Sequence, residues 1–570
     1  MSIISIDRTM PAMTEDRQLR PRRILVLLLN LASWIALGAL MAQIIGSAGW
    51  SWAGVTIMLL YLIALPWTLL AFWNAVIGFF ILRFHNDPAS YTNPALKRTD
   101  LQAAITARTA LCFCIRHENV PGVLARVKAM RRSLGALYQG RQIEFHILSD
   151  STRADICAEE EIAFASDPSL HYRRRSANIG YKAGNLRDFA IAYSDQVDFM
   201  IVLDADSLMS GAAVLRLVRV MQANPNLGIL QTLVTGRPAT SPFARIFQFG
   251  MRHGMRTHTT GIAWWQGSSG PYWGHNAIIR LRPFVAHCAL PVLREGLPLA
   301  GHMLSHDQVE AALMRAAGFD VRVTADEFES WEENPPRLPD FIRRDLRWCQ
   351  GNLQYLRLIG QRGFRPMGRF QLCNAIAMYL GAPASIIMLT VGIANGLSGR
   401  HGHVPHALAF GLYFGMLILG FAPRLLGVVD ILLRTEDRRR WGGGMRLLAG
   451  AATDAVFTVM IGPVMMVAQS RFIFGLLFGQ RIIWEAQQRD DGAVTLREAI
   501  SGLWPQFLLG LFFGSATWLV APGSLPWAIP TLAGSLLAVP FACITASPQL
   551  GAWMQRVRLC SVPGEGDDFR

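Results

Sequence analysis

The chain has 570 residues, of which 52% are hydrophobic and 16% are charged, and its mean hydropathy is +0.28. These values argue against a soluble protein and indicate that much of the chain lies in a membrane. The formal net charge of +14 is typical of basic cytoplasmic loops that face anionic lipids, and we favour that explanation over nucleic-acid binding.

Residues 1–100 predict a short cytoplasmic tail followed by two membrane-spanning helices. The segments 24–47 and 52–82 carry almost no charge, and each exceeds the roughly 20 residues that a spanning helix needs. Arg22 and Arg23 precede the first segment, so a cleaved signal peptide is the alternative for it. The length of that segment and the second apolar segment directly after it favour two spans.

Residues 101–350 are more polar and predict one globular α/β domain. Its apolar runs predict three buried strands, at 111–115, 143–148 and 199–203. Helical spacing follows the first strand at 121–132, and strands that alternate with helices favour a parallel sheet.

Acidic residues follow the ends of all three predicted strands. Glu118, Asp150 and Asp204 would therefore gather at one sheet edge, where open parallel sheets bind ligands. Asp204 and Asp206 place two carboxylates at i and i+2, which is a suitable oxygen ligand set for Mg²⁺ or Mn²⁺ on a diphosphate. The alternative for this triplet is a plain solvated turn.

Two glycine-containing segments of the domain are candidates for substrate contact. The first, 178–185, combines Lys182 with two glycines and two asparagines ahead of a helix expected at 186–192, which suits a phosphate; a loop that only caps this helix is the alternative. The second, 267–276, places Trp273 and His275 among glycines, which suits a sugar ring; a buried aromatic turn is the alternative.

The last two motifs of the domain carry a carboxylate and a basic, aromatic cluster. Asp307 precedes a helical pattern at 308–316, so we expect it to be an N-cap whose carboxylate is available as a general base. Arg344, Arg347 and Trp348 come just before the membrane returns; guanidinium groups bind diphosphates, and an indole ring can face a sugar. Membrane-interface anchors are the alternative for this motif.

Residues 351–570 predict interfacial helices, a C-terminal bundle of spanning helices and a short tail. Five further spans are expected, at 372–395, 407–432, 447–469, 507–521 and 528–545. Residues 471–484 fit an interfacial helix or part of an eighth crossing, so the chain should cross the membrane about seven to eight times. The arginines at 438–440 and those before the first span predict that the domain is cytoplasmic.

The eight cysteines lie mostly in apolar or cytoplasmic contexts and form no CxxC pair. We therefore expect free thiols and no zinc site.

Four of these motifs, in this order, resemble the D, DxD, TED and QxxRW motifs of processive family 2 glycosyltransferases, which include cellulose, chitin and hyaluronan synthases. They are Asp150, Asp204-Ala205-Asp206, Ser305-His306-Asp307 and Arg344-Asp345-Leu346-Arg347-Trp348. The segments 148–151, 272–280 and 343–352 look closer to the branch that makes osmoregulated periplasmic glucans. Arg344 in place of glutamine, and Ser305-His306 in place of Thr-Glu, are similar to that branch.

The resemblance implies a GT-A (Rossmann-like) domain inserted into the membrane helices, and a role for each motif residue. Glu118 and Asp150 would hold the uridine, and Lys182 would lie at the nucleotide or its phosphates. Asp204 and Asp206 would hold the metal and diphosphate, Arg344 and Arg347 would bind the diphosphate, and Asp307 would be the general base. Trp348, Trp273 and His275 would bind the acceptor.

By this resemblance, the protein would be an enzyme of the bacterial inner membrane that polymerises glucose from UDP-glucose, with Mg²⁺ or Mn²⁺, into a mainly β-1,2-linked backbone. The growing glucan would attack with inversion and pass through the protein's own helices, among membrane lipids, towards periplasmic proteins that process it. A gating loop is expected at 484–500. Two alternatives stay open: a synthase of another β-polysaccharide, such as cellulose or hyaluronan, and a transporter or channel whose domain only senses a nucleotide.

Overall fold

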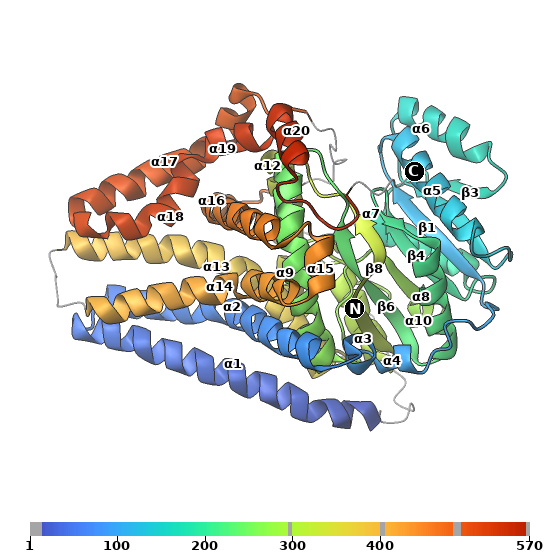
Figure 1. Cartoon of the computed structure of the whole chain (residues 1–570), viewed down its shortest axis with the longest axis horizontal. Helices are drawn as coiled ribbons and strands as arrows, with labels where there is room; N and C mark the ends of the chain where they lie inside the picture. Colours follow the sequence, from blue (N-terminus) through green and yellow to red (C-terminus); the bar gives the residue numbers. More distant parts are fainter. Residues whose placement is uncertain (1–13, 295–298, 399–404, 483–491, 566–570) are drawn as a thin grey trace.

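The computed structural model describes residues 14–294, 299–398, 405–482 and 492–565. An α/β domain lies at one end of the molecule and a bundle of long helices at the other (Figure 1). Residues 484–491 of the expected gating loop lie outside the described residues, and the chain from Leu496 onwards belongs to a long helix.

Within the described residues, six helices are long and apolar enough to cross a membrane. They are α1 (Thr14–Ser47), α2 (Trp52–Phe84), α13 (Pro366–Leu397), α14 (His406–Leu432), α16 (Gly444–Leu477) and α17 (Leu496–Val520). A seventh crossing arises if the bent pair α18 (Leu525–Leu536) and α19 (Ala538–Thr545) counts as one span. The short helices α3 (Pro88–Thr92), α4 (Pro94–Lys97), α15 (Thr435–Arg440) and α20 (Pro548–Val557) flank these segments.

The predicted spans are helical, with two differences from expectation. The span expected at 528–545 is bent by 60° between α18 and α19, because Pro540 has no N–H to continue the hydrogen bonding of α18. The segment that begins at Arg471 is not a separate interfacial helix, since α16 continues to Leu477. It ends just before Gly479, whose φ of 84° suits the turn after a helix.

An eight-stranded sheet in the order β3-β2-β1-β4-β7-β6-β8-β5 forms the α/β domain. The strands are β1 (Thr109–Ile115), β2 (Ile143–Ser149), β3 (Leu170–Arg174), β4 (Phe199–Asp204), β5 (Leu208–Met209), β6 (Leu227–Gly236), β7 (Ala277–Arg280) and β8 (Asp320–Glu332). The parallel pairing predicted for the first strands is confirmed, because β1 pairs in parallel with both β2 and β4. Beyond β4 the sheet becomes mixed, since β7 is antiparallel to β4 and to β6.

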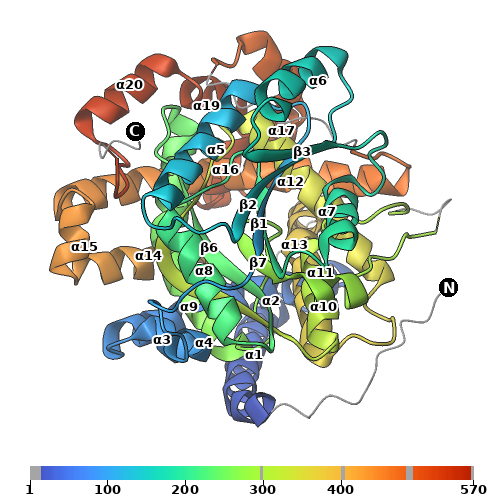
Figure 2. The same cartoon turned by 90° about the vertical axis from the view of Figure 1, so that its right-hand side faces the viewer.

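Helices bury both faces of this sheet (Figure 2). One hydrophobic core contains residues of α7 (Tyr181–Tyr193), α10 (Leu281–His287) and α11 (Asp307–Ala316), and the other contains residues of α5 (Val120–Gly135) and α8 (Gly211–Ala223). The short segments α6 (Ala154–Glu160) and η1 (Glu161–Ala165) precede β3. The central strands are therefore buried on both sides, as their continuous apolar runs predict.

Two helices, α9 (Pro242–Gln266) and α12 (Leu338–Leu353), lie between the sheet and the bundle (Figure 1). At the crossing of α2 and α9, a Cβ on Gly78 would overlap the carbonyl oxygen of Thr257, and a Cβ on Gly261 would overlap that of Asn74. The two backbones therefore touch, as in membrane helices that pack through small residues.

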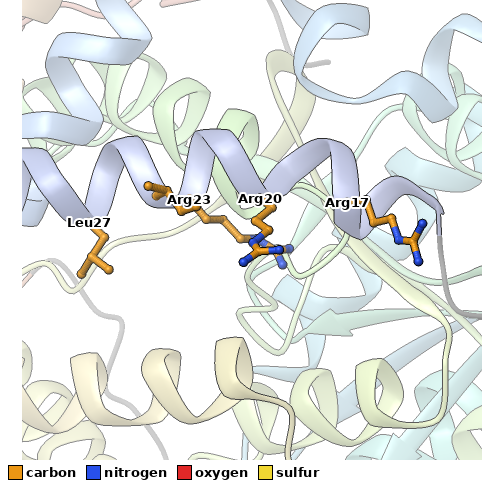
Figure 3. Close-up of a pocket in the computed structure, with 5 residues that line it drawn as sticks. Arg17, Arg20, Arg23 and Leu27 are labelled. Atoms are coloured by element: carbon orange, nitrogen blue, oxygen red, sulfur yellow. The ribbon is translucent and has the colours of Figure 1, made fainter.

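The start of α1 is tied to the end of α9. Arg22 donates to the carbonyl oxygen of Trp264 at 3.1 Å, and Arg23 donates to that of Gln266 at 3.0 Å. These carbonyl groups lack helical partners at a C-terminus, where positive charge is also favourable. Arg17, Arg20 and Arg23 follow one another along one side of α1 (Figure 3), so a basic stripe marks the end of this helix that faces the α/β domain.

Replacing Gly78 with alanine should destabilise the protein, because the added methyl group would overlap the Thr257 carbonyl and push α2 away from α9. We expect a loss of about 1–3 kcal/mol in the free energy of unfolding, measured as a lower midpoint of thermal unfolding in detergent. Gly392→Ala in α13 is the matched control, since nothing lies within 4 Å of its added methyl group. Equal midpoints for the two variants would contradict the close contact.

Candidate active site

Lys182 joins three of the predicted motifs at the carboxyl end of β4. It forms an ion pair with Asp204, and its Nζ donates to the carbonyl oxygen of Gly274 at 2.7 Å. Burial opposes a charge on Lys182, but the neighbouring Asp204 raises the pKa of this lysine above its usual value. The lysine is therefore cationic at neutral pH and holds the acidic turn against the loop 267–276.

Lys182 lies in a helix rather than in a loop, which corrects the sequence prediction. The helix expected at 186–192 begins at Tyr181, after Gly180 with a φ of 69°. Glycine adopts this left-handed conformation without strain, so the chain can turn sharply into the helix here. The first helical turn thus directs the lysine towards β4.

Asp307 lies beside the same loop. A Cβ placed on Gly274, whose φ is 85°, would lie 3.4 Å from Cβ and 3.7 Å from Oδ2 of Asp307. Asp307 is the first residue of α11 and His306 is the N-cap, so the expected N-cap role of Asp307 is wrong by one position. The charge of Asp307 also contributes to the raised pKa of Lys182, so the expected base and the acidic turn share one site.

His306 and Glu310 form a buried pair next to Asp307. The Nδ1 of His306 lies 2.8 Å from Oε2 of Glu310. Burial alone would lower the pKa of His306, but the carboxylate of Glu310 raises it above the usual value. The contact between His306 and Glu310 spans the first turn of α11, next to Asp307.

Glu332, the last residue of β8, is an acid that the sequence prediction missed. Burial raises its pKa, the charges of Asp206 and Asp204 raise it further, and His275 and Arg344 oppose the shift. The Nε2 of His275 lies 3.4 Å from Oε2 of Glu332. The charge of Glu332 is therefore coupled to the acidic turn, to His275 and to Arg344. The signal in the sequence was its position at the end of a segment with alternating side chains.

Asp150 is held by Arg175, another residue that sequence reasoning missed. Arg175 donates from Nε to Oδ1 at 2.7 Å and from a terminal nitrogen to Oδ2 at 2.9 Å. This bidentate pair fixes the carboxylate at the end of β2. Because β1 lies between β2 and β4, Asp150 is two strands, or about 10 Å, from Asp204. Arg175 closes a run of three arginines, the first two of which end β3, a signal that was visible but not assigned a role.

Glu118 follows β1, the strand between these two acids. The backbone N–H of its neighbour His117 donates to Oγ of Ser151 at 2.8 Å. The loops that carry Glu118 and Asp150 are therefore adjacent, as their strand order predicts.

The basic and aromatic motif lies on α12. The guanidinium group of Arg344 lies over the ring of Trp348, 4.8 Å from its centroid, and Trp348 is 44% exposed. Arg347 follows Arg344 by three residues on the same helix. The exposed face of the indole ring is available for stacking, because Arg344 covers the other side.

Hydrogen bonds tie the 3-10 helix η2 (Gln354–Arg357), which directly follows α12, to the loop before Asp307. The Tyr355 hydroxyl donates to the carbonyl oxygen of Ser305 at 2.9 Å, and the Leu304 N–H donates to Oε1 of Gln354 at 2.9 Å. A Cβ on Gly351 would overlap Oγ of Ser305, so α12 and this loop touch directly. The candidate base and the Arg344–Trp348 pair are consequently held as one unit.

Gln231 on β6 holds the segment that contains Trp273 and His275. Its Oε1 accepts the N–H of Trp273 at 2.8 Å, and its Nε2 donates to the carbonyl oxygen of His275 at 3.0 Å. Both predicted acceptor residues are partly exposed, and the carbonyl group of Gly274 between them accepts the hydrogen bond from Lys182. Gln231 carried no signal in the sequence, because its role depends on a loop more than forty residues away.

Comparisons with known proteins identify the family of the chain. A sequence profile of Glycosyl transferase family group 2 matches residues 199–422. Glucans biosynthesis glucosyltransferase H from Rhodopseudomonas palustris is 36% identical over 515 residues, which cover 86% of this chain and 70% of that protein. The protein of the same name from Bradyrhizobium diazoefficiens is 35% identical over 556 residues, covering 93% of this chain and 73% of that protein.

The chain belongs to the glucans biosynthesis glucosyltransferase H family. It is thus a glycosyltransferase of family 2 with several apolar helices, as its motifs predict. Among solved structures, the mannosyltransferase PcManGT from Pyrobaculum calidifontis, in complex with GDP-Man and Mn²⁺, is 16% identical with a TM-score of 0.39. The match covers 69% of this chain and 98% of that one.

Asp345, between Arg344 and Leu346, should make stability depend on pH. Burial raises its pKa to about 6, although Nε2 of Gln469 in α16 donates to its Oδ2 at 2.8 Å. Because the folded pKa exceeds the unfolded one, the protonated carboxyl group stabilises the fold below about pH 4, and this contribution is lost as pH rises through 6.

Asp345→Asn should therefore raise the free energy of unfolding at pH 8 by up to about 3 kcal/mol, which appears as a higher midpoint of thermal unfolding. At pH 4 the substitution should make little difference. Thermal unfolding at several pH values measures this. Asp195→Asn, at an exposed position, is the control. A variant that tracks the wild type at every pH would refute the assignment.

Proposed function

We propose that the protein transfers glucose from UDP-glucose to the growing end of a β-glucan and so builds the mainly β-1,2-linked backbone of osmoregulated periplasmic glucans. One observation carries the proposal: the acidic turn and the candidate base meet at Gly274, because Lys182 joins Asp204 to the carbonyl group of this glycine and Asp307 lies beside it. The relatives named glucans biosynthesis glucosyltransferase H support glucose as the unit and a glucan as the product.

Asp204 and Asp206 would hold a divalent cation, Mg²⁺ or Mn²⁺. The residues fit such an ion, since two carboxylates stand at i and i+2 where β4 ends, and hard oxygen ligands are those that these cations prefer. Glu332 lies close enough for the charges of Asp206 and Asp204 to add to the rise in its pKa that burial causes. When bound, the cation would neutralise charge on the diphosphate that leaves.

The remaining chemistry belongs to side chains of the chain itself. Asp307 would accept the proton of the attacking glucan hydroxyl, and direct attack at C1 would invert the anomeric centre. Lys182, Arg344 and Arg347 would bind phosphate oxygens.

The two substrates would occupy different parts of the sheet edge. The distance of about 10 Å between Asp150 and Asp204 suits the uracil ring of the nucleotide at one strand end and its diphosphate at the other. A uridine near Glu118 would meet the Asp150–Arg175 pair rather than a lone carboxylate. Trp348, Trp273 and His275 would bind the acceptor sugars.

Charge at the helix ends supports a cytoplasmic domain and an inner-membrane location. The arginines of α1 and those at 438–440 on α15 lie at the ends of the bundle that face the α/β domain (Figure 1). Basic residues mark the cytoplasmic side of spanning helices. Since α12 contacts α13 and α16, an acceptor leaving Trp348 would enter the bundle, which is the proposed route of translocation.

The direct test is incorporation of labelled UDP-glucose into polymer by purified protein in lipid vesicles with Mg²⁺, followed by linkage analysis. A β-1,2-linked glucan supports the proposal. A β-1,4-linked polymer would identify another β-polysaccharide synthase, and no transfer from any UDP-sugar would favour a nucleotide-sensing channel. Product retained only on the cytoplasmic face would contradict translocation.

Asp307→Asn should abolish transfer while UDP binding survives, because the amide cannot accept the hydroxyl proton. We expect the turnover rate to fall by at least about 100-fold, measured by release of UDP, with UDP affinity measured by calorimetry. Asp195→Asn is the matched control at an exposed position away from the site. Unchanged turnover in Asp307→Asn would rule out the base role and favour a domain that only binds nucleotide.

A further inference from the structure

A second cluster of ligating side chains lies on the edge of the sheet, away from the acidic turn. His146 on β2 and His171 on β3 are direct cross-strand partners, and their rings stack with centroids 4.5 Å apart. Glu144 precedes His146 by two residues, so all three side chains lie on one face of the sheet. Both histidines direct Nε2 at the same carboxylate oxygen, Oε2 of Glu144, at 3.4 and 4.0 Å.

We propose that Glu144, His146 and His171 bind one divalent transition-metal ion, with zinc as the best fit. The three ligand atoms lie within 4.8 Å of one another. Zinc bonds of about 2.0–2.1 Å would place neighbouring ligand atoms about 3.3 Å apart, so small side-chain rotations close the site. Two imidazoles and one carboxylate suit zinc better than Mg²⁺, which prefers oxygen ligands alone.

The surroundings of the cluster orient its ligands. Arg108 donates to Oε1 of Glu144 at 2.8 Å and leaves Oε2 facing the histidines, as outer partners of metal-binding carboxylates do. His146 is buried against Phe189 and Tyr193, whereas the side chain of His171 is 54% exposed. The buried histidine thus has a fixed position, and the exposed one keeps the site open to an ion and to water.

The cluster is separate from the proposed active site. His146 lies four residues before Asp150, which directly follows β2. His171 likewise lies four residues before Arg175, which directly follows β3. This spacing corresponds to about 13 Å of extended chain. A metal here would cross-link the edge strand β3 to β2, the two strands that carry the Asp150–Arg175 pair. The set contains no cysteine, which is why cysteine spacing predicted no zinc site.

The test uses the full-length protein in detergent, purified without a histidine tag and stripped of metal by a chelator. Titration with Co²⁺ should give one equivalent of nitrogen-coordinated metal, visible as d–d absorption bands, and Zn²⁺ should displace it. His171→Ala, at an exposed position, should weaken binding more than tenfold while the circular dichroism spectrum stays unchanged. Glu144→Gln should also weaken it, because the amide is not an anionic ligand.

Two controls separate this site from other metal-binding groups. His85→Ala removes an exposed histidine elsewhere and should leave Co²⁺ affinity unchanged. The double variant Asp204→Asn/Asp206→Asn should keep the absorption bands, because the acidic turn of the proposed active site is not involved. Three results would each overturn the proposal. The absorption bands could persist in His171→Ala, they could be lost in the double variant, or the wild type could fail to bind Co²⁺ at micromolar metal.

Discussion

Direct backbone contact between α9 and the membrane helices is the constraint on which the rest of the structure depends. A Cβ on Gly78 of α2 would overlap the Thr257 carbonyl, and a Cβ on Gly427 of α14 would overlap that of His253. The same helix packs on β6 and β8 of the sheet. Because no side chain separates the backbones at these crossings, α9 has little freedom to slide or tilt. The sheet is thereby held at a fixed place relative to the bundle.

The same kind of contact positions the chemistry. Gly351 on α12 lies against Ser305, just before Asp307, and Gly274 lies against Asp307 itself. A Cβ on Gly351 would overlap Oγ of Ser305, whereas a Cβ on Gly274 would make ordinary van der Waals contact with Asp307. Gly274 is required instead by its φ of 85°, which other residues rarely adopt. Rigid placement of this kind matters for a transferase, since a small displacement between a base and its substrate can cost much of the rate. Glycines far apart in the sequence thus set the geometry of one site.

The sequence predicted three of the eight strands, β1, β2 and β4, and the acids that follow them, because apolar runs are local signals and parallel pairing has a known spatial consequence. The other five strands were not predicted. The sequence also did not predict residues whose role depends on distant partners. Arg175 matters because it meets Asp150, and Glu332 because it meets Asp204 and Asp206 from a strand more than a hundred residues later. The bend between α18 and α19 was missed because hydropathy measures apolarity and is blind to Pro540.

The charges of the site explain why a diphosphate would need a cation there. Asp204, Asp206, Asp307 and Glu332 bring four carboxyl groups to the end of the sheet, and the basic side chains whose charges act on them include Lys182 and Arg344. Burial raises the pKa of Glu332, and the charges of Asp206 and Asp204 raise it further. An added diphosphate alone would increase the repulsion, and Lys182 already pairs with Asp204. The proposed binding of a diphosphate here is therefore consistent with a bound divalent cation, for which the two carboxylates where β4 ends are suitable ligands.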